Sequence, residues 1–102
     1  MARAILLVRE KKIYENGDIL EAVVWRVPAA PGSLSGVRYR LVFVRHGQRV
    51  PAVLYDNHSP KGHHRHIEGT EEPYRFVDVE RLLEDFIADV RRVSGDDEWP
   101  RR

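Results

Sequence analysis

Residues 37–45 read Val37-Arg38-Tyr39-Arg40-Leu41-Val42-Phe43-Val44-Arg45 and decide the fold. Successive side chains of a β-strand point to opposite faces, so residues two apart share a face. Four apolar side chains therefore share one face, namely Val37, Tyr39, Leu41 and Phe43. Arg38 and Arg40 share the opposite face, where they either bind phosphate or only keep the sheet soluble. The pattern predicts a strand with one buried side.

Three other segments have strand composition. Ile19–Val27 is rich in β-branched and apolar residues and suits a central strand, and Ala4–Arg9 is expected to be a short buried strand. Val50–Asp56 follows a turn at His46–Arg49, and its Pro51 fits only an edge strand or a strand start. Because the connections are short and no helix interrupts them, we expect an antiparallel meander of about four strands.

Turn-forming residues separate these strands. Asn16-Gly17 supplies the positive φ that a tight hairpin turn needs, and Pro28–Gly36 consists of turn formers and small residues. We expect Pro28–Gly36 to be a loop rather than a linker between domains, because a chain of 102 residues buries one modest core. The sequence thus predicts a single domain over residues 1–102.

One helix is predicted, from about Val79 to Val93. Its apolar residues recur at a spacing of three and four: Val79, Leu82, Leu83, Phe86, Val90 and Val93. Asp78 is the expected N-cap, Ser94-Gly95 ends the helix, and residues 96–102 form a polar tail. An apolar stripe of this kind must pack on one face of the sheet, so the fold class is α+β.

Charge and composition limit the function. The net charge is +1, but basic residues dominate from Arg38 to Arg65 and acidic residues dominate from Glu68 onward. One positive surface favours an anionic ligand. The chain has no cysteine, which excludes disulfides, thiolate metal sites and a cysteine nucleophile. The apolar run near the N-terminus is too short for a signal peptide or a membrane span, so we expect a cytoplasmic protein.

The segment Tyr55–His66 contains four of the five histidines of the chain. Histidine both accepts and donates protons near neutral pH, and Lys and Arg stabilise developing anionic charge. The candidate groups for acid–base chemistry are His58, His63, His64 and His66, and those for charge stabilisation are Lys61 and Arg65. Tyr74 and Arg75 would add a phenol and a guanidinium if the chain folds back. The alternative is a solvated basic loop without chemistry.

Alternation within this segment leaves two arrangements open. In an extended chain His64 and His66 share one face, and His63 and Arg65 share the other. Either pair would then face the substrate. A zinc site is a further alternative, since a His-x-His pair and a third histidine would need only an oxygen ligand such as Asp56 or Glu68.

Three motifs stand out in the second half of the chain: Asp56-Asn57, the run Lys61–His66 and Glu72-Pro73-Tyr74-Arg75-Phe76. Together they resemble a known family, the TumE-like toxins of bacterial toxin–antitoxin modules. The resemblance covers nearly the whole chain and implies a growth-inhibiting protein with ribonuclease activity. It also implies an antitoxin partner, commonly a helix-turn-helix DNA-binding protein. The positions carried over from the family motif are Asp56, Lys61, His64, Arg65, His66 and Tyr74.

The resulting hypothesis is a metal-independent endoribonuclease without a cofactor. His64 and His66 share acid–base duty, Lys61 and Arg65 stabilise the phosphate, and Asp56 orients a histidine. Tyr74 belongs to the same catalytic group. The expected substrate-binding residues are His58, His63, Arg38, Arg40 and Arg75.

Two alternatives and one open point accompany this hypothesis. The protein would inhibit growth only by occupying nucleic acid or a partner, or it would transfer phosphate or nucleotidyl groups. The transfer alternative lacks the support of a glycine-rich phosphate loop in the sequence. The expected partners are RNA and an antitoxin, with a homodimer left open.

Overall fold

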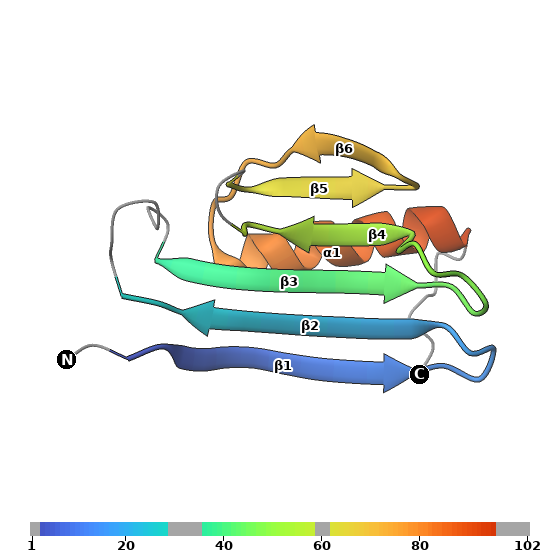
Figure 1. Cartoon of the computed structure of the whole chain (residues 1–102), viewed down its shortest axis with the longest axis horizontal. Coiled ribbons are helices and arrows are strands. Elements are labelled where there is room, and N and C mark those ends of the chain that lie inside the picture. The colour runs from blue at the N-terminus through green and yellow to red at the C-terminus, as the bar shows by residue number, and fades with distance from the viewer. Residues whose placement is uncertain (1–2, 29–35, 59–61, 96–102) are drawn as a thin grey trace.

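Six strands in chain order form one antiparallel sheet, with a single helix on one side (Figure 1). The computed structural model describes residues 3–28, 36–58 and 62–95. The elements are β1 (Ile5–Ile13), β2 (Ile19–Arg26), β3 (Val37–Val44), β4 (Val53–Asp56), β5 (His64–Ile67), β6 (Thr70–Pro73) and α1 (Val79–Ser94). The predicted α+β class is confirmed. The predicted loop over residues 29–35, the predicted tail over 96–102 and Lys61 lie outside the described residues.

The sheet has two more strands than the expected four. The second half of the histidine segment is β5, and it pairs with β6 through a two-residue turn at Glu68-Gly69. Both turn residues have positive φ, 51° and 86°, as a type I′ hairpin turn requires. The sequence composition did not predict these strands, because both are short and mostly polar and their propensity for β-structure is therefore weak.

Strand β1 differs most from the prediction. It extends to Ile13 and is an exposed edge strand, whereas a short buried strand was expected. Ile5 is 50% exposed, and of this strand only Val8 packs partly against the core. The reason is its position, since α1 packs on β4 and β1 lies at the far edge of the sheet. A β-bulge at Leu7 and the charged residues that follow interrupt the exposed edge, which disfavours pairing with other chains.

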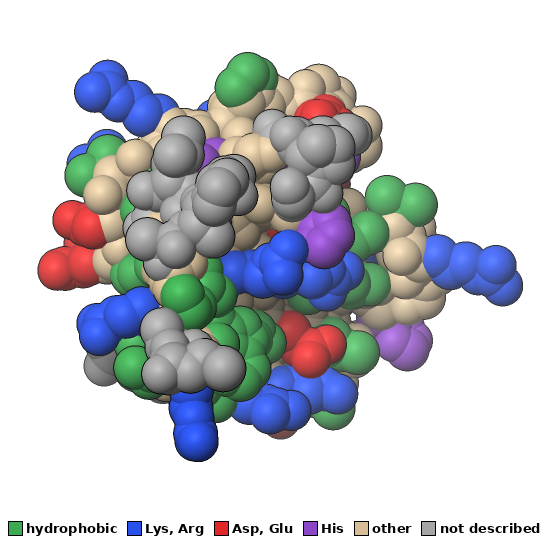
Figure 2. Space-filling model, turned by 60° about the vertical axis from the view of Figure 1, so that its left-hand side comes forward, with side chains coloured by type: hydrophobic (Ala, Val, Ile, Leu, Met, Phe, Trp, Pro, Cys, Tyr) green, Lys and Arg blue, Asp and Glu red, His purple; other side chains and the backbone are tan. Residues whose placement is uncertain are grey.

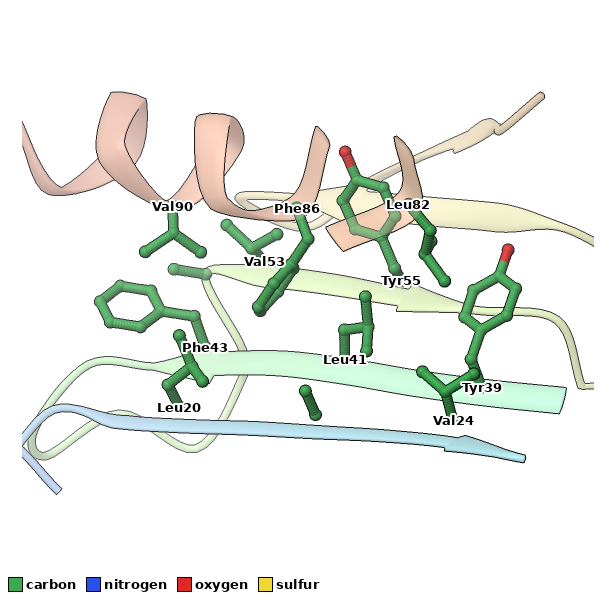
Figure 3. Close-up of a cluster of buried hydrophobic side chains, with 12 residues drawn as sticks. Leu20, Val24, Tyr39, Leu41, Phe43, Val53, Tyr55, Leu82, Phe86 and Val90 are labelled. Atoms are coloured by element: carbon green, nitrogen blue, oxygen red, sulfur yellow. The ribbon is translucent and has the colours of Figure 1, made fainter. Parts of the chain in front are cut away.

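The core lies between the sheet and α1. Figure 3 shows Leu82, Phe86 and Val90 of α1 facing the buried side chains of β2, β3 and β4. These three helix residues are buried, and Val79, Leu83 and Val93 are partly buried, which confirms the predicted apolar stripe. The alternation predicted for residues 37–43 is also confirmed, because Tyr39, Leu41 and Phe43 are buried and Arg38 and Arg40 are exposed.

The helix ends are those that the sequence predicts. The Asp78 side chain accepts a hydrogen bond from the Arg81 amide at 2.7 Å, as an N-cap does. At the other end Gly95 adopts φ 69° and its amide donates to the Arg91 carbonyl at 3.0 Å. Pro51 precedes β4, so of its two predicted placements the one near a strand start is confirmed. The edge placement is wrong because β4 lies between β3 and β5.

The sheet therefore has two chemically different sides. We call the side that α1 covers the helix face and the other side the open face. Since Tyr39 and Tyr55 belong to the core beneath α1, their neighbours along β3 and β4 point to the open face. By register, the open face also carries alternate residues of β1, β2 and β5.

Candidate active site on the open face of the sheet

A row of polar side chains crosses three neighbouring strands of the open face. Arg40 of β3 is paired with Asp56 of β4, and Asp56 is paired with His64 of β5. Directly paired residues of an antiparallel sheet have side chains on the same face, with Cβ atoms about 5 Å apart. The sheet thus places a cation, a carboxylate and an imidazole side by side, although Arg40 and His64 are 24 residues apart in the chain.

Asp56 and His64 form the centre of this row. The Asp56 Oδ1 atom lies 2.9 Å from His64 Nε2, and His64 is 7% exposed. On the opposite side of the ring, His64 Nδ1 donates to the Gly62 carbonyl at 2.8 Å. Both ring nitrogens therefore have oxygen partners at hydrogen-bond distance. The Asp56 carboxylate lies where it can orient the His64 ring, which is the contact that the predicted orienting role of Asp56 needs.

His66 lies next to His64 on the same face, so the predicted sharing of a face by these two residues is confirmed. The ring centroids are 5.3 Å apart and the rings meet edge to face. His66 Nε2 lies 3.6 Å from Glu71 Oε1 of β6, and the His66 side chain is partly exposed. His66 is thus the more accessible of the two histidines of β5.

A groove of about 510 Å³ lies beside the row. It is lined by Val23, Trp25, Arg38, Tyr39, Arg40, Asp56 and His58. His58 is exposed, with Nδ1 at 3.4 Å from the Arg38 guanidinium, and its amide donates to Asp56 Oδ1 at 3.3 Å. Figure 2 shows Lys and Arg side chains beside a histidine near the middle of this end of the molecule. The predicted substrate-binding residues Arg38, Arg40 and His58 therefore come together.

Asn57 holds this region in place and was not among the predicted site residues. Its amide group donates to the Val37 carbonyl at 2.7 Å, and its carbonyl oxygen accepts from the Tyr39 amide at 3.0 Å. The side chain thus imitates a backbone partner and continues the pairing of β3 past the end of β4. Asn57 fixes Asp56 and His58 on either side of it. The Asp56-Asn57 pair in the family motif was the available signal.

Arg65 lies on the helix face, opposite its neighbours His64 and His66. Its guanidinium donates to the Tyr55 hydroxyl at 3.1 Å and to Asp89 Oδ2 at 2.9 Å, and it also pairs with Glu72. The Tyr55 hydroxyl donates to the same Asp89 carboxylate, which is 1% exposed. We call Arg65, Tyr55, Asp89 and Glu72 the Arg65 network. It ties β5 to α1 and is separated from the histidine row by the sheet itself.

Tyr74 also lies on the helix side. Its hydroxyl donates to Asp85 Oδ2 of α1 at 2.7 Å, and its ring packs edge to face on Tyr55. Burial raises the pKa of Tyr74, and the Asp85 carboxylate raises it further. Tyr74 is therefore a protonated phenol directed at the helix. Arg75, the next residue, is exposed.

His63 is placed between aromatic rings at the end of β5. It stacks on Tyr39 and Phe76 at centroid distances of 5.6 and 5.0 Å, and its Nδ1 lies 2.8 Å from the Tyr39 hydroxyl. Burial lowers the pKa of His63, as does the charge of His64. His63 is thus a neutral packing residue in this arrangement. It belongs to the side of Arg65, as alternation predicts.

Sequence reasoning did not find two other features of these surfaces. Asp89 lies in the apolar stripe of α1, where a carboxylate that interrupts an amphipathic pattern was the available signal. Trp25 lies in a strand of apolar composition, yet it is 36% exposed and lines the groove. Among the described residues, no three His, Asp or Glu side chains converge as metal ligands would.

The fold and the site define a small α+β protein with a basic, histidine-bearing sheet face. The sequence model of the Toxin TumE family matches residues 3–94, which is nearly the whole chain. The chain therefore belongs to the TumE toxin family and is a toxin component. Neither a curated protein nor a solved structure matches it significantly. No helix in the described part of the chain is long and apolar enough to span a membrane.

Proposed function

We propose that this toxin is a metal-independent endoribonuclease that cleaves RNA on the open face of its sheet. The observation that supports the proposal is the row formed by Arg40, Asp56 and His64, with His66 beside it. Cleavage of RNA without a metal needs a base for the 2′-hydroxyl proton, an acid for the leaving 5′-oxygen and cations near the phosphoryl oxygens. Side chains of each kind occur on this face.

The geometry suggests how these roles are divided. His66 is partly exposed and is the proposed base, whereas His64, which lies against the Asp56 carboxylate, is the proposed acid. Arg40 is the proposed ligand of the phosphoryl oxygens, together with Lys61. Asp56 positions His64, and His58 and Arg38 bind the adjoining part of the RNA.

The helix-face residues take supporting roles in this proposal. Arg65 anchors β5 to α1 and thereby sets the position of His64 and His66, rather than contacting the phosphate itself. Tyr74 packs on the same network through Tyr55. His63 and Arg75 are left as weaker candidates for RNA contacts at the edge of the sheet.

Family membership suggests an antitoxin partner, and the proposed cellular setting follows from it. The antitoxin is expected to be a helix-turn-helix protein, made together with the toxin in the bacterial cytoplasm. It would inhibit the toxin either by covering the open face or by binding the acidic segment from Glu71 to Asp89.

The test is incubation of the purified protein with total RNA in EDTA. Wild type is compared with His64→Ala and His66→Ala, and the ends of the products are mapped. The expected result is cleavage that leaves 2′,3′-cyclic phosphate ends and falls at least about 100-fold in either variant. His46→Ala is the matched control, because His46 is exposed in a turn away from the row.

One observation favours a second candidate, inhibition by binding alone. Both nitrogens of His64 already have protein partners, as in a structural histidine. Binding alone predicts a graded loss of toxicity when Arg38 or Arg40 is removed and little change when the histidines are replaced by neutral residues. Intact RNA together with that pattern of toxicity would exclude the ribonuclease.

A further inference from the structure

Trp25 is the one large aromatic residue of strands β2 to β4 that the core does not enclose. Phe43, Tyr39 and Tyr55 are at most 3% exposed, whereas Trp25 is 36% exposed and lies on the open face. Its cross-strand partner is Arg38, and Leu6 flanks it on the edge strand. Exposure of an indole in the interior of a sheet face loses the free energy that its burial would contribute. A ligand that covers the ring would recover this free energy.

The surroundings of Trp25 indicate the chemistry of that ligand. The groove that Trp25 lines is also lined by Arg38, Arg40 and His58, with Asp56 as its acidic residue. Asp56 contacts His64, and the two arginines outnumber this one carboxylate in the groove. A volume of about 510 Å³ lies within the range of pockets that hold small organic groups. A flat apolar surface flanked by cations is complementary to a planar base attached to phosphates.

We infer that Trp25 is a stacking platform for one unpaired nucleobase, and that Arg38 and Arg40 contact the phosphates beside it. Arg38 and Arg40 are same-face neighbours on β3, about 7 Å apart, which suits consecutive phosphates of an extended strand. Stacking on a side chain needs a base that is not already stacked in a duplex. The inference rests on the proposed function and refines it, since it makes single-stranded RNA the substrate class.

The position of the platform also relates binding to cleavage. Trp25 and Val23 are same-face neighbours on β2, and Val23 is paired with Arg40, the first member of the row. A strand whose base stacks on Trp25 therefore passes over Arg40 toward Asp56 and His64. Binding at Trp25 would fix which phosphate reaches the histidines.

The test uses tryptophan fluorescence and an oligonucleotide that the enzyme cannot cleave. The chain has two tryptophans, so Trp99→Phe leaves Trp25 as the sole emitter. A single-stranded 2′-O-methyl oligonucleotide lacks the attacking hydroxyl and serves as the probe. The expected result is quenching of Trp25 by the single strand and weaker binding to the duplex of the same sequence. Affinities of the variants are measured by fluorescence anisotropy of the same oligonucleotide carrying a dye, and Trp25→Ala is expected to lose about tenfold. Trp25→Phe should retain most of the affinity.

The control is a second exposed apolar residue of the sheet, and two results would contradict the stacking inference. Ile13→Ala removes another exposed apolar side chain of the sheet, 69% exposed, and should bind the probe as wild type does. Circular dichroism of each variant reports whether it is folded. Unchanged affinity of a folded Trp25→Ala variant overturns the stacking inference, and RNA cleavage by that same variant would show that the ribonuclease proposal survives. Absence of probe binding by the wild type also overturns the inference, and the groove would then be a candidate site for a protein partner.

Discussion

At the residue scale, adjacent residues of the histidine segment have different partners because successive side chains of a strand point to opposite faces. His64 meets Asp56 on the open face, and Arg65 meets Asp89 beneath the helix. A side chain outside the predicted set, Asn57, fixes the end of β4 through two backbone hydrogen bonds. The composition of the segment therefore says little about which of its cations can reach a phosphate.

Asn57→Ala is expected to destabilise the protein by about 2 kcal/mol, because it removes the two hydrogen bonds that the Asn57 side chain makes to the Val37 carbonyl and to the Tyr39 amide. Urea denaturation of the variant and of wild type measures the difference. His58→Ala, the neighbouring exposed position, is the control and should change stability by less than about 0.5 kcal/mol. Equal stability of the Asn57 variant and wild type would contradict the prediction.

His63 should make stability depend on pH. Its pKa is lowered from 6.5 by burial and by His64, so the folded state prefers the neutral ring. The unfolded chain then binds the proton more readily, and this contribution to stability is full above about pH 6.5 and is lost as the pH falls toward the lowered value. In His63→Phe, which keeps a ring between Tyr39 and Phe76, the loss between about pH 7.5 and pH 5.5 should be smaller than in wild type.

Urea titrations at the two pH values give the comparison for His63. His46→Phe is the matched control, since His46 is exposed in a turn, and it should follow the wild-type pH dependence. The prediction fails if His63→Phe loses as much stability on acidification as wild type does.

At the element scale, β5 has two separate attachments. Its open-face side chains interact with Asp56 and Glu71, and its helix-face arginine reaches Asp89 of α1. Three of the four residues of β5 are polar and only Ile67 packs against the core, so these polar contacts help to hold the strand in the sheet. The turn Glu68-Gly69 gave a sequence signal for the β5–β6 hairpin, but the polar flanking residues masked it.

Asp89→Ala should be among the more damaging single substitutions. It leaves the Tyr55 hydroxyl and part of the Arg65 guanidinium without an acceptor beneath the helix, at a cost of about 3 kcal/mol. Thermal denaturation should therefore show a clear drop in Tm. Glu84→Ala removes an exposed carboxylate from the same helix and is expected to leave Tm nearly unchanged. Comparable Tm values for the two variants would refute a stabilising role for the Arg65 network.

At the scale of the whole molecule, the two sides of the sheet differ in how charge is distributed. The open face carries Arg38, Arg40 and His58 around the groove, and Arg9 extends the row because it is paired with Val23. The outer side of α1 is mixed, since it exposes Glu80 and Glu84 together with Arg81, Arg91 and Arg92. The formal charge of +1 therefore conceals a basic side that attracts polyanions.

Reversal of a charge at the far end of the row should weaken RNA binding without touching the groove. Arg9→Glu is expected to lower affinity severalfold at low salt, with a smaller effect at high salt because the interaction is screened. Lys12→Glu makes the same change of sign on the opposite side of β1, where the register pairs it with Leu20 of the core face. Filter binding at two salt concentrations compares the variants, and equal losses in both would argue against binding across the open face.

The sequence by itself determined the features that repeat locally. The alternation of residues 37–43 fixed which side of β3 is buried, and the spacing of Leu82, Phe86 and Val90 fixed the inner side of α1. The motif run led to the TumE toxin family, which the match over residues 3–94 confirmed. Periodicity and motifs can be recognised in the sequence because both consist of residues that are close together in the chain.

Only the tertiary structure decided which distant residues meet. It joined Arg40, Asp56 and His64 in one row, brought Arg65 and Tyr74 to carboxylates of α1, and left Trp25 exposed beside the arginines. Strand register and the position of α1 set these contacts, and both depend on how the whole core packs. A shift of one residue in register would reverse the face of every side chain in a strand, and the composition of the segment would be unchanged.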